Sequence, residues 1–131
     1  TIQEFKTRKV IQHNHEVGNT IIEKTLEIIK ESNLENYIEV IPCPWMVAYQ
    51  FKEKKGEKSN GLRTFFLQEM ILKGVLFQGI FVPSLSHGKQ EIDFFLSSFE
   101  EAVTAYSKAL EEGYENHLIG PIIKPVFRKY I

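Results

Sequence analysis

One segment of this chain is apolar on almost every side if it is wound into a helix. Residues 62–73 read LRTFFLQEMILK, with apolar side chains at nearly every helical spacing, whereas a surface helix confines them to one stripe. Gly74 follows directly, at the position where glycine commonly ends a helix. A helix of this kind has to be buried between layers, so the rest of the chain must cover it on more than one side.

The first 31 residues are predicted to be helical in two pieces. Apolar residues recur there at steps of three, four and seven, which is typical of a helix with one buried face. Asn14 and Gly18 are poor helix formers on that face, and they predict a bend or break near residues 9–14. Asn33 is expected to end the helix.

The clearest helix is predicted over residues 89–112, where six large apolar residues line one face. Gly88 or Ser86 can cap its start, and Glu91 stands three residues after Gly88, where a capping-box carboxylate belongs. Gly113 is expected to end it. The helix therefore has a capping signal at its start and a stop signal at its end.

Short runs of β-branched and aromatic residues lie between these helices. They occupy residues 37–41, 45–51, 75–77 and 80–82, with two prolines between the first two runs and a polar loop at 52–60. Strands grouped between helices with short connections predict an α+β fold. The expected sheet is small, mostly antiparallel and three- to four-stranded, with helices packed on one face.

Charge and composition exclude several classes of function. The chain has 16 Lys and Arg against 17 Asp and Glu, a formal charge of −1, so no broad electrostatic surface for nucleic acid or an anionic membrane is expected. No apolar run approaches the roughly 18 residues that a spanning helix needs. The single cysteine excludes an internal disulfide and a CxxC motif. These features predict a cytoplasmic protein.

Three residue clusters could carry chemistry, and each has a simpler interpretation. His13 and His15 resemble a metal pair, but residues two apart on a helix point away from each other, so no metal site is predicted. Ser86 and His87 could form a nucleophile and base, yet they are favoured as partners of the exposed amides of the next helix. Cys43, between two prolines, lacks a basic partner in the sequence.

Polar residues in the apolar segment are expected to have structural roles. Gln68 and Glu69 are predicted to find a backbone partner or to lie at a subunit boundary. Arg63 could meet a carboxylate, although its place in the first helical turn favours a solvated or structural role.

Several motifs together resemble one known family. The segment LRTFFLQEM at 62–70, followed by GVLF at 74–77, resembles a stretch in the small C-terminal domain of class-III pyridoxal-phosphate aminotransferases. The nearest branch is the glutamate-1-semialdehyde aminotransferase-like proteins. VIQHNHEVG at 10–18, PSLSHGKQEID at 83–93 and KPVFRKY at 124–130 resemble further motifs of that branch in the same order.

The resemblance implies a domain rather than a whole enzyme. Residues 1–131 would be a single small domain, cut from a longer two-domain protein, since the chain begins at Thr1 within an expected helix. In this family a large domain holds pyridoxal phosphate, while the small domain closes the substrate pocket and supports a homodimer. The chain alone is expected neither to bind the cofactor nor to transaminate. The alternative is a non-enzymatic interaction or dimerisation module with the same fold.

The substrate would be a small amino or keto compound held in the parent enzyme. Semialdehyde aminomutases carry a glutamate in the stretch that corresponds to 76–83, and this chain has none there, which leaves aminotransferase and aminomutase open. Because scaffolds present functional groups on turns, the candidates for the substrate pocket are Pro44, Trp45, Gln78 and Gly79. A packed core role is the competing interpretation for Trp45. No catalytic or cofactor-binding residue is predicted in the chain itself.

The final segment, residues 114–131, contains two prolines and is expected to be irregular. Phe127 and Tyr130 are the residues that could dock it onto the domain.

Overall fold

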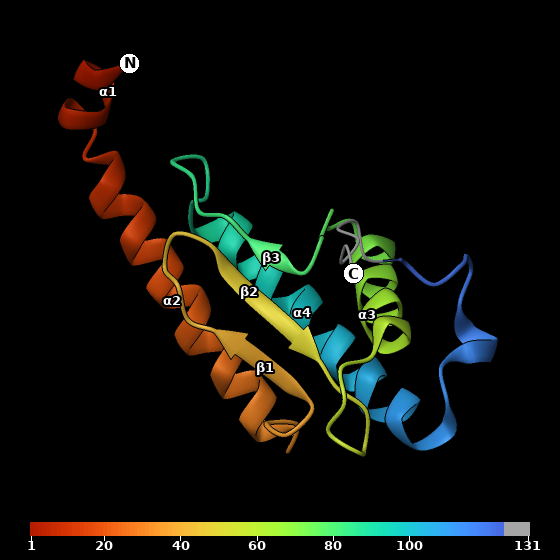
Figure 1. The fold of residues 1–131 in the computed structure, drawn as a ribbon. Helices are drawn as coiled ribbons and strands as arrows, with labels where there is room; N and C mark the ends of the chain where they lie inside the picture. Colours follow the sequence, from red (N-terminus) through yellow and green to blue (C-terminus); the bar gives the residue numbers. More distant parts are fainter. Residues whose placement is uncertain (125–131) are drawn as a thin grey trace, which may run out of the picture.

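The structure is a computed structural model, which describes residues 1–124 (Figure 1). In chain order the elements are α1 (Ile2–Thr7), α2 (Val10–Glu31), β1 (Ile38–Ile41), β2 (Val47–Phe51), α3 (Asn60–Leu72), β3 (Ile80–Phe81), α4 (Lys89–Glu112) and the 3₁₀ turn η1 (Glu115–His117).

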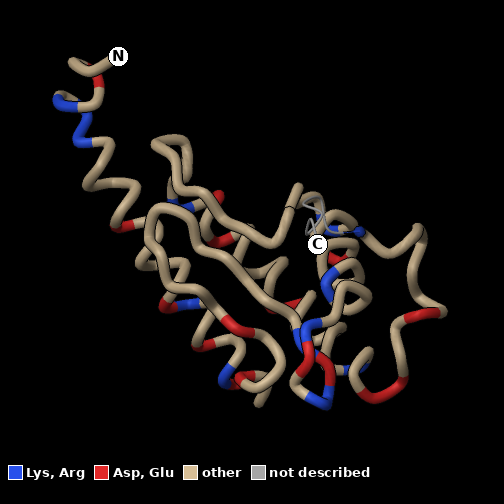
Figure 2. Tube along the Cα trace, viewed as in Figure 1, with Lys and Arg blue, Asp and Glu red and all other residues tan. Residues whose placement is uncertain are grey.

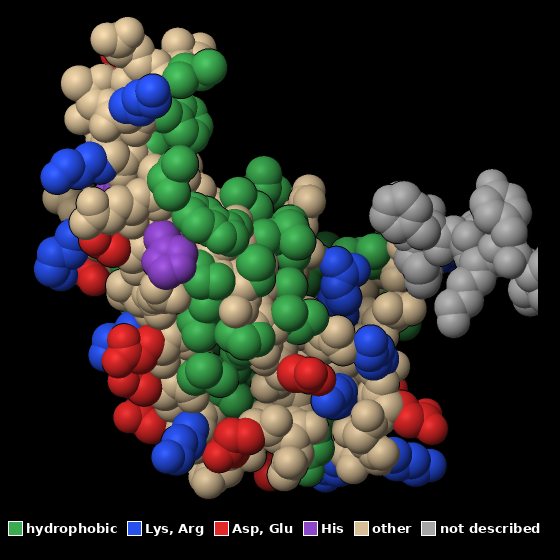
Figure 3. Space-filling model, turned by 60° about the vertical axis from the view of Figure 1, so that its left-hand side comes forward, with side chains coloured by type: hydrophobic (Ala, Val, Ile, Leu, Met, Phe, Trp, Pro, Cys, Tyr) green, Lys and Arg blue, Asp and Glu red, His purple; other side chains and the backbone are tan. Residues whose placement is uncertain are grey.

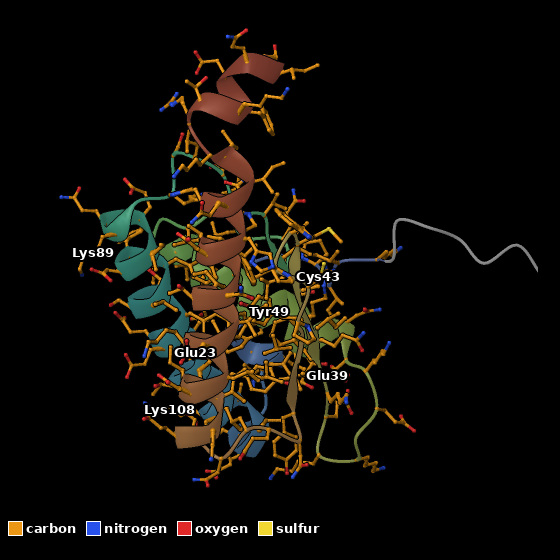
Figure 4. The ribbon with its side chains drawn as sticks, turned by 90° about the vertical axis from the view of Figure 1, so that its left-hand side faces the viewer. Glu23, Glu39, Cys43, Tyr49, Lys89 and Lys108 are labelled. Atoms are coloured by element: carbon orange, nitrogen blue, oxygen red, sulfur yellow. The ribbon has the colours of Figure 1, made fainter. Side chains whose placement is uncertain are left out.

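The three strands form one antiparallel sheet in the order β1-β2-β3. Ile41 pairs with Ala48, and Ala48 in turn pairs with Ile80, so these three residues form a row across the sheet. Helices α2 and α4 lie on one face of the sheet, α3 packs against α4 and β2 at its side, and α1 projects away from the sheet (Figures 1 and 4). The predicted α+β class, the antiparallel sheet and its one-sided helical cover are confirmed.

The core lies between the sheet and the helices. Its centre is an aromatic cluster in which Phe66 of α3 contacts Phe51, Phe77, Phe99 and Tyr106, with ring centroids 4.7 to 6.1 Å apart. Phe66 is completely buried, and seven residues of α3 are buried in all. The apolar segment is therefore enclosed by other elements, as its sequence predicts.

Helix ends follow the stop signals. At the end of α3, Gly74 takes a positive φ of 90°, and its N–H donates to the Ile71 carbonyl while the Val75 N–H donates to the Met70 carbonyl. This is the Schellman arrangement, which satisfies carbonyls that a helix end leaves free. Asn33, with a φ of 55°, ends α2 in the same way.

Several element boundaries differ from the sequence-based expectation, and the strand expected from residue 45 begins at Val47. Helix α3 begins at Asn60, inside the expected loop, because the Ser59 hydroxyl caps it by accepting the Leu62 N–H at 3.1 Å. The N-terminal break falls at Lys9, whose φ is 49°, at the first residue of the predicted interval. Beyond it, α2 continues unbroken through Asn14 and Gly18.

The strand expected at residues 75–77 does not form. Val75 uses its amide to close the cap of α3, so the chain leaves the helix in an irregular conformation, and the Leu76 side chain is 87% exposed. Of the two short candidates, only β3 joins the sheet. Phe77 is nevertheless buried, so this segment still contributes to the core.

Charged residues are concentrated on the helices and loops (Figure 2). Strands β2 and β3 contain none, and β1 contains only Glu39, which forms an ion pair with Lys52 at 2.7 Å. This pair lowers the pKa of Glu39, chiefly through the hydrogen bond from Lys52. Because β2 and β3 have no charged residue, the upper part of the sheet in Figure 2 carries no charge.

Candidate functional site

The face of the sheet opposite the helices is open and locally apolar. Ile41 and Ile80, at the two ends of the row through Ala48, are each 39% exposed. Met46 just before β2 and Val82 just after β3 extend this surface and are about half exposed. We call these five residues the open apolar face. Figure 3 shows the apolar surface that runs from the N-terminal helices over the sheet, with charges at its margins.

The alternation of the strands produces this arrangement. Val47, Tyr49 and Phe51 of β2 point toward the helices and are buried, while Ala48 and Gln50 between them point the other way. Figure 4 shows the result, with Tyr49 directed to the helices and Glu39 to the open side. A sheet open to water usually carries polar residues on its outer face. Here only the end around Glu39 and Gln50 does so.

The connection between β1 and β2 is held close to α2. A Cβ added to Gly18 would lie 1.9 Å from the Pro44 carbonyl oxygen, so only glycine allows this approach. Trp45, next in the chain, is 47% exposed, and its ring lies 5.3 Å from that of His15. The interpretation of Trp45 as a packed core residue is therefore wrong, because the turn directs it outward beside α2.

The second pair of candidates forms a turn that Arg63 supports. Gly79 has a φ of 84°, and its carbonyl accepts the Tyr49 N–H at 3.0 Å, which joins the turn to β2. The Arg63 guanidinium donates to the Gln78 carbonyl at 2.9 Å. Arg63 thus has the structural role that its helical position favours.

The four substrate-pocket candidates do not converge in this chain. Gly79 lies opposite Tyr49 in the middle of β2, whereas Pro44 and Trp45 lie in the turn that precedes β2. Gln78 lines a cavity of about 480 Å³, and Pro44 and Trp45 do not line it. The two pairs therefore lie at separate places along the same sheet.

The residues considered for chemistry have mainly structural partners. The His87 Nδ1 accepts the Ser84 N–H at 3.0 Å, so its partner is Ser84 and not Ser86. Glu91 accepts the Gly88 N–H at 3.0 Å, as its capping position predicts. Gln68 donates to the His117 carbonyl and accepts the Ile119 N–H, at 2.9 and 2.8 Å, and so fixes the segment after α4.

The two N-terminal histidines occupy different surroundings, as helical spacing predicts. His15 is exposed, and its Nδ1 lies 3.1 Å from the Asn19 amide nitrogen. His13 is half-buried, and its Nε2 has no hydrogen-bond partner among the described residues. Within residues 1–124, no three histidine, cysteine or carboxylate side chains are grouped closely enough to hold a metal ion. Cys43 is exposed and unpaired there.

Sequence reasoning did not locate the open apolar face on the sheet. The signal was present, because residues 45–49 read WMVAY, an unbroken apolar run rather than the alternation of a strand with one wet face. The first expectation for such a run is a strand covered on both sides.

Comparisons with known proteins add no further assignment. No family model, no curated protein and no solved structure matches this chain. Within residues 1–124, no helix has both the length and the apolar character needed to cross a membrane. Phe127 and Tyr130 lie outside the described residues.

Proposed function

We propose that this chain is the small domain of a class-III pyridoxal-phosphate aminotransferase, and that it closes the substrate pocket of a cofactor-bearing large domain. The proposal rests on the collinear motif resemblance. The open apolar face is the structural observation that supports it, since an excised domain exposes apolar surface where its neighbour lay.

The chain's own residues do not fit the cofactor. A Schiff base with pyridoxal phosphate requires a lysine within a pocket, and no lysine lines the cavity that contains Gln78. Lys108 lines a second cavity, but Glu69 and Glu112 share that lining and would repel a phosphate group. Lys6 lines a third cavity, in which Thr1 is the only other polar residue to meet a phosphate group. These linings support a cofactor held by the other domain, and no chemical step is assigned to this one.

The role left for this chain is to cover and shape the substrate pocket. Closure of a small domain excludes water and completes a pocket built on another domain. The turn at Gln78 and Gly79 is suited to this task because β2 and Arg63 both hold it in place. Trp45 presents an exposed aromatic surface from a turn held close to α2. In the parent enzyme these residues would face a small amino or keto substrate, and the domain would support the homodimer.

The coding DNA upstream of the Thr1 codon tests this proposal. We expect an open reading frame that continues into a large domain with a Schiff-base lysine, and a complete product that binds stoichiometric pyridoxal phosphate. A start codon directly before Thr1 would contradict the proposal and favour a stand-alone interaction module.

A second experiment tests whether the isolated chain binds the cofactor. Incubation with pyridoxal phosphate, borohydride reduction and mass spectrometry should give no single lysine modified in stoichiometric yield. One such lysine would show that this domain binds the cofactor itself and would overturn the division of labour proposed here.

A further inference from the structure

A groove lies between residues 74–82 and the first two turns of α4. Its volume of about 480 Å³ lies within the range of small-molecule sites. Four phenylalanines line it, of which Phe94 is half exposed while Phe77, Phe81 and Phe95 are largely buried behind it. Phe77 and Phe81 each contact Phe95, with ring centroids 5.8 and 4.8 Å apart, so these rings form a continuous apolar wall.

One side of the groove is polar and carries His87 and Glu91, which are four residues apart. The His87 Nδ1 accepts the Ser84 N–H, which places the proton of the neutral ring on Nε2. Burial lowers the pKa of His87; nearby Glu91 acts in the opposite direction and His13 of α2 in the same one. The ring is therefore neutral at pH 7 and adds no positive charge to the groove.

Among residues 1–124, Glu91 supplies the only formal charge in the lining. Its Oε2 accepts the Gly88 N–H, but it forms no ion pair within residues 1–124. Its neighbour Asp93 pairs with Lys89, and Glu101 pairs with Lys73 at 2.6 Å. Glu91 thus meets a backbone N–H at the start of α4 but no cationic side chain within residues 1–124.

We propose that this groove binds a small primary amine that carries an aryl group. The ammonium group pairs with the Glu91 carboxylate, and the aryl group packs against the phenylalanine walls. An ammonium ion complements the single negative charge, whereas a carboxylate ligand would face it without a cationic partner. The groove shares Gln78, Ile80 and Val82 with the surfaces assigned above, whereas Glu91 and Phe94, which carry this inference, belong to neither.

Titration of the folded chain with 2-phenylethylamine tests the proposal, with amide chemical shifts as the readout. The matched probes are 2-phenylethanol, which is neutral, and 3-phenylpropanoate, which is anionic. We expect the amine to shift the amides of residues 74–82 and 87–95. It should bind about threefold to tenfold more tightly than the alcohol, and the anion more weakly still. Equal binding of all three probes, or shifts outside the groove, would overturn the proposal.

Variants on α4 separate the charge from the wall. Glu91→Gln keeps a capping oxygen for Gly88 and should weaken amine binding about threefold to tenfold, with no effect on the alcohol. Phe94→Ala removes a half-exposed wall residue and should weaken both. The matched control is Glu100→Gln, an exposed carboxylate on the same helix outside the groove, which should change neither. If Glu91→Gln binds the amine like the unaltered chain, the carboxylate is not the anchor.

The chosen variants also keep this site distinct from the open apolar face. Ile80 and Val82 border both surfaces, whereas Glu91 and Phe94 belong to the groove alone. Loss of amine binding in those variants would therefore say nothing about docking of a second domain, and the two inferences can fail separately.

Discussion

The two faces of the sheet are built from the same strands but have different surroundings. On the covered face, Val47, Tyr49 and Phe51 are at most 4% exposed beneath three helices. Ile41 and Ile80 on the open face are also apolar, yet each is 39% exposed. The difference shows that the central strand β2 lies in a sheet with two apolar faces, and that the helices of this chain cover only one of them.

The open face is also divided along its length. Its apolar end is the row through Ala48, while its other end holds Gln50 and the ion pair between Glu39 and Lys52. A limited apolar patch with a polar margin is typical of an interaction surface. The comparison therefore predicts that substitutions on the covered face change stability, whereas those on the open face change association.

The largest effect is expected from Phe66→Ala on the covered side. The side chain is fully buried and contacts four other aromatic rings, so its removal should lower the free energy of unfolding by about 3–5 kcal/mol. Urea unfolding followed by circular dichroism measures this. A loss below about 1 kcal/mol would mean that the aromatic cluster is not the core.

Gly18→Ala should be the next largest. Alanine is the better helix former, but its Cβ would meet the Pro44 carbonyl, and relief of this clash moves the backbone. We expect a net loss of about 1–3 kcal/mol in the same unfolding experiment. Gly120→Ala, where an added Cβ meets nothing within 4 Å, is the control and should be nearly neutral. Stabilisation by Gly18→Ala would contradict the close packing of this connection.

Tyr106→Phe tests a polar bond at the edge of the core. The Tyr106 hydroxyl donates to the Lys52 carbonyl at 2.7 Å, and its loss should cost about 1 kcal/mol. Burial raises the pKa of Tyr106, and also that of Tyr49, above the ordinary phenol value. Their contribution to stability is therefore present below pH about 10 and falls as pH rises beyond it. Tyr106→Phe should flatten this alkaline decline, as measured by thermal unfolding between pH 8 and 11.

A smaller effect, on stability at acidic pH, is expected from His87. Because burial lowers its pKa, the folded chain binds its proton less readily than the unfolded chain does. The stability from His87 is complete above its ordinary pKa of about 6.5 and decreases as pH falls through the lowered value. Replacement by Asn should reduce the loss of melting temperature between pH 7.5 and pH 5. An unchanged pH slope would exclude His87 as a source of it.

The smallest effect on stability is expected on the open apolar face. Ile80→Thr and Val82→Thr remove exposed apolar groups while retaining β-branching, so each should change the free energy of unfolding by less than about 0.5 kcal/mol. The same variants should reduce self-association of the isolated chain, measured by analytical ultracentrifugation. Large destabilisation with unchanged association would reverse the assignment of the two faces.

Much of the fold could be predicted because its signals are local. The bounds of α4, the stops at Asn33 and Gly74, and the burial of α3 all follow from periodicity and capping residues near the element concerned. The strand expected at residues 75–77 could not be judged in the same way. Its residues favour a β-strand, but the Val75 N–H donates to the Met70 carbonyl in the cap of α3 and is not free to pair with a strand.

The site was harder to predict because it depends on long-range placement. In the sequence, Gly18 indicates a weak point of a helix. Only the structure shows that its lack of a side chain admits the backbone of Pro44, 26 residues away. Trp45 reads as core by residue type, although its turn directs it outward. The apolar row of the open face forms because Ile41 pairs with Ala48 and Ala48 pairs with Ile80. This strand register depends on three separate segments, so no single segment predicts it.

The central claim is that the open apolar face docks against a second domain. Hydroxyl-radical footprinting tests it most directly, because Met46 is 49% exposed on that face and is oxidised readily. Leu26, 47% exposed on α2, is the control. Between the isolated chain, at a concentration where it is monomeric, and the protein expressed from the complete gene, Met46 oxidation should fall at least fivefold while Leu26 stays unchanged. Equal oxidation of Met46 in both would show that nothing covers this face and would contradict the account.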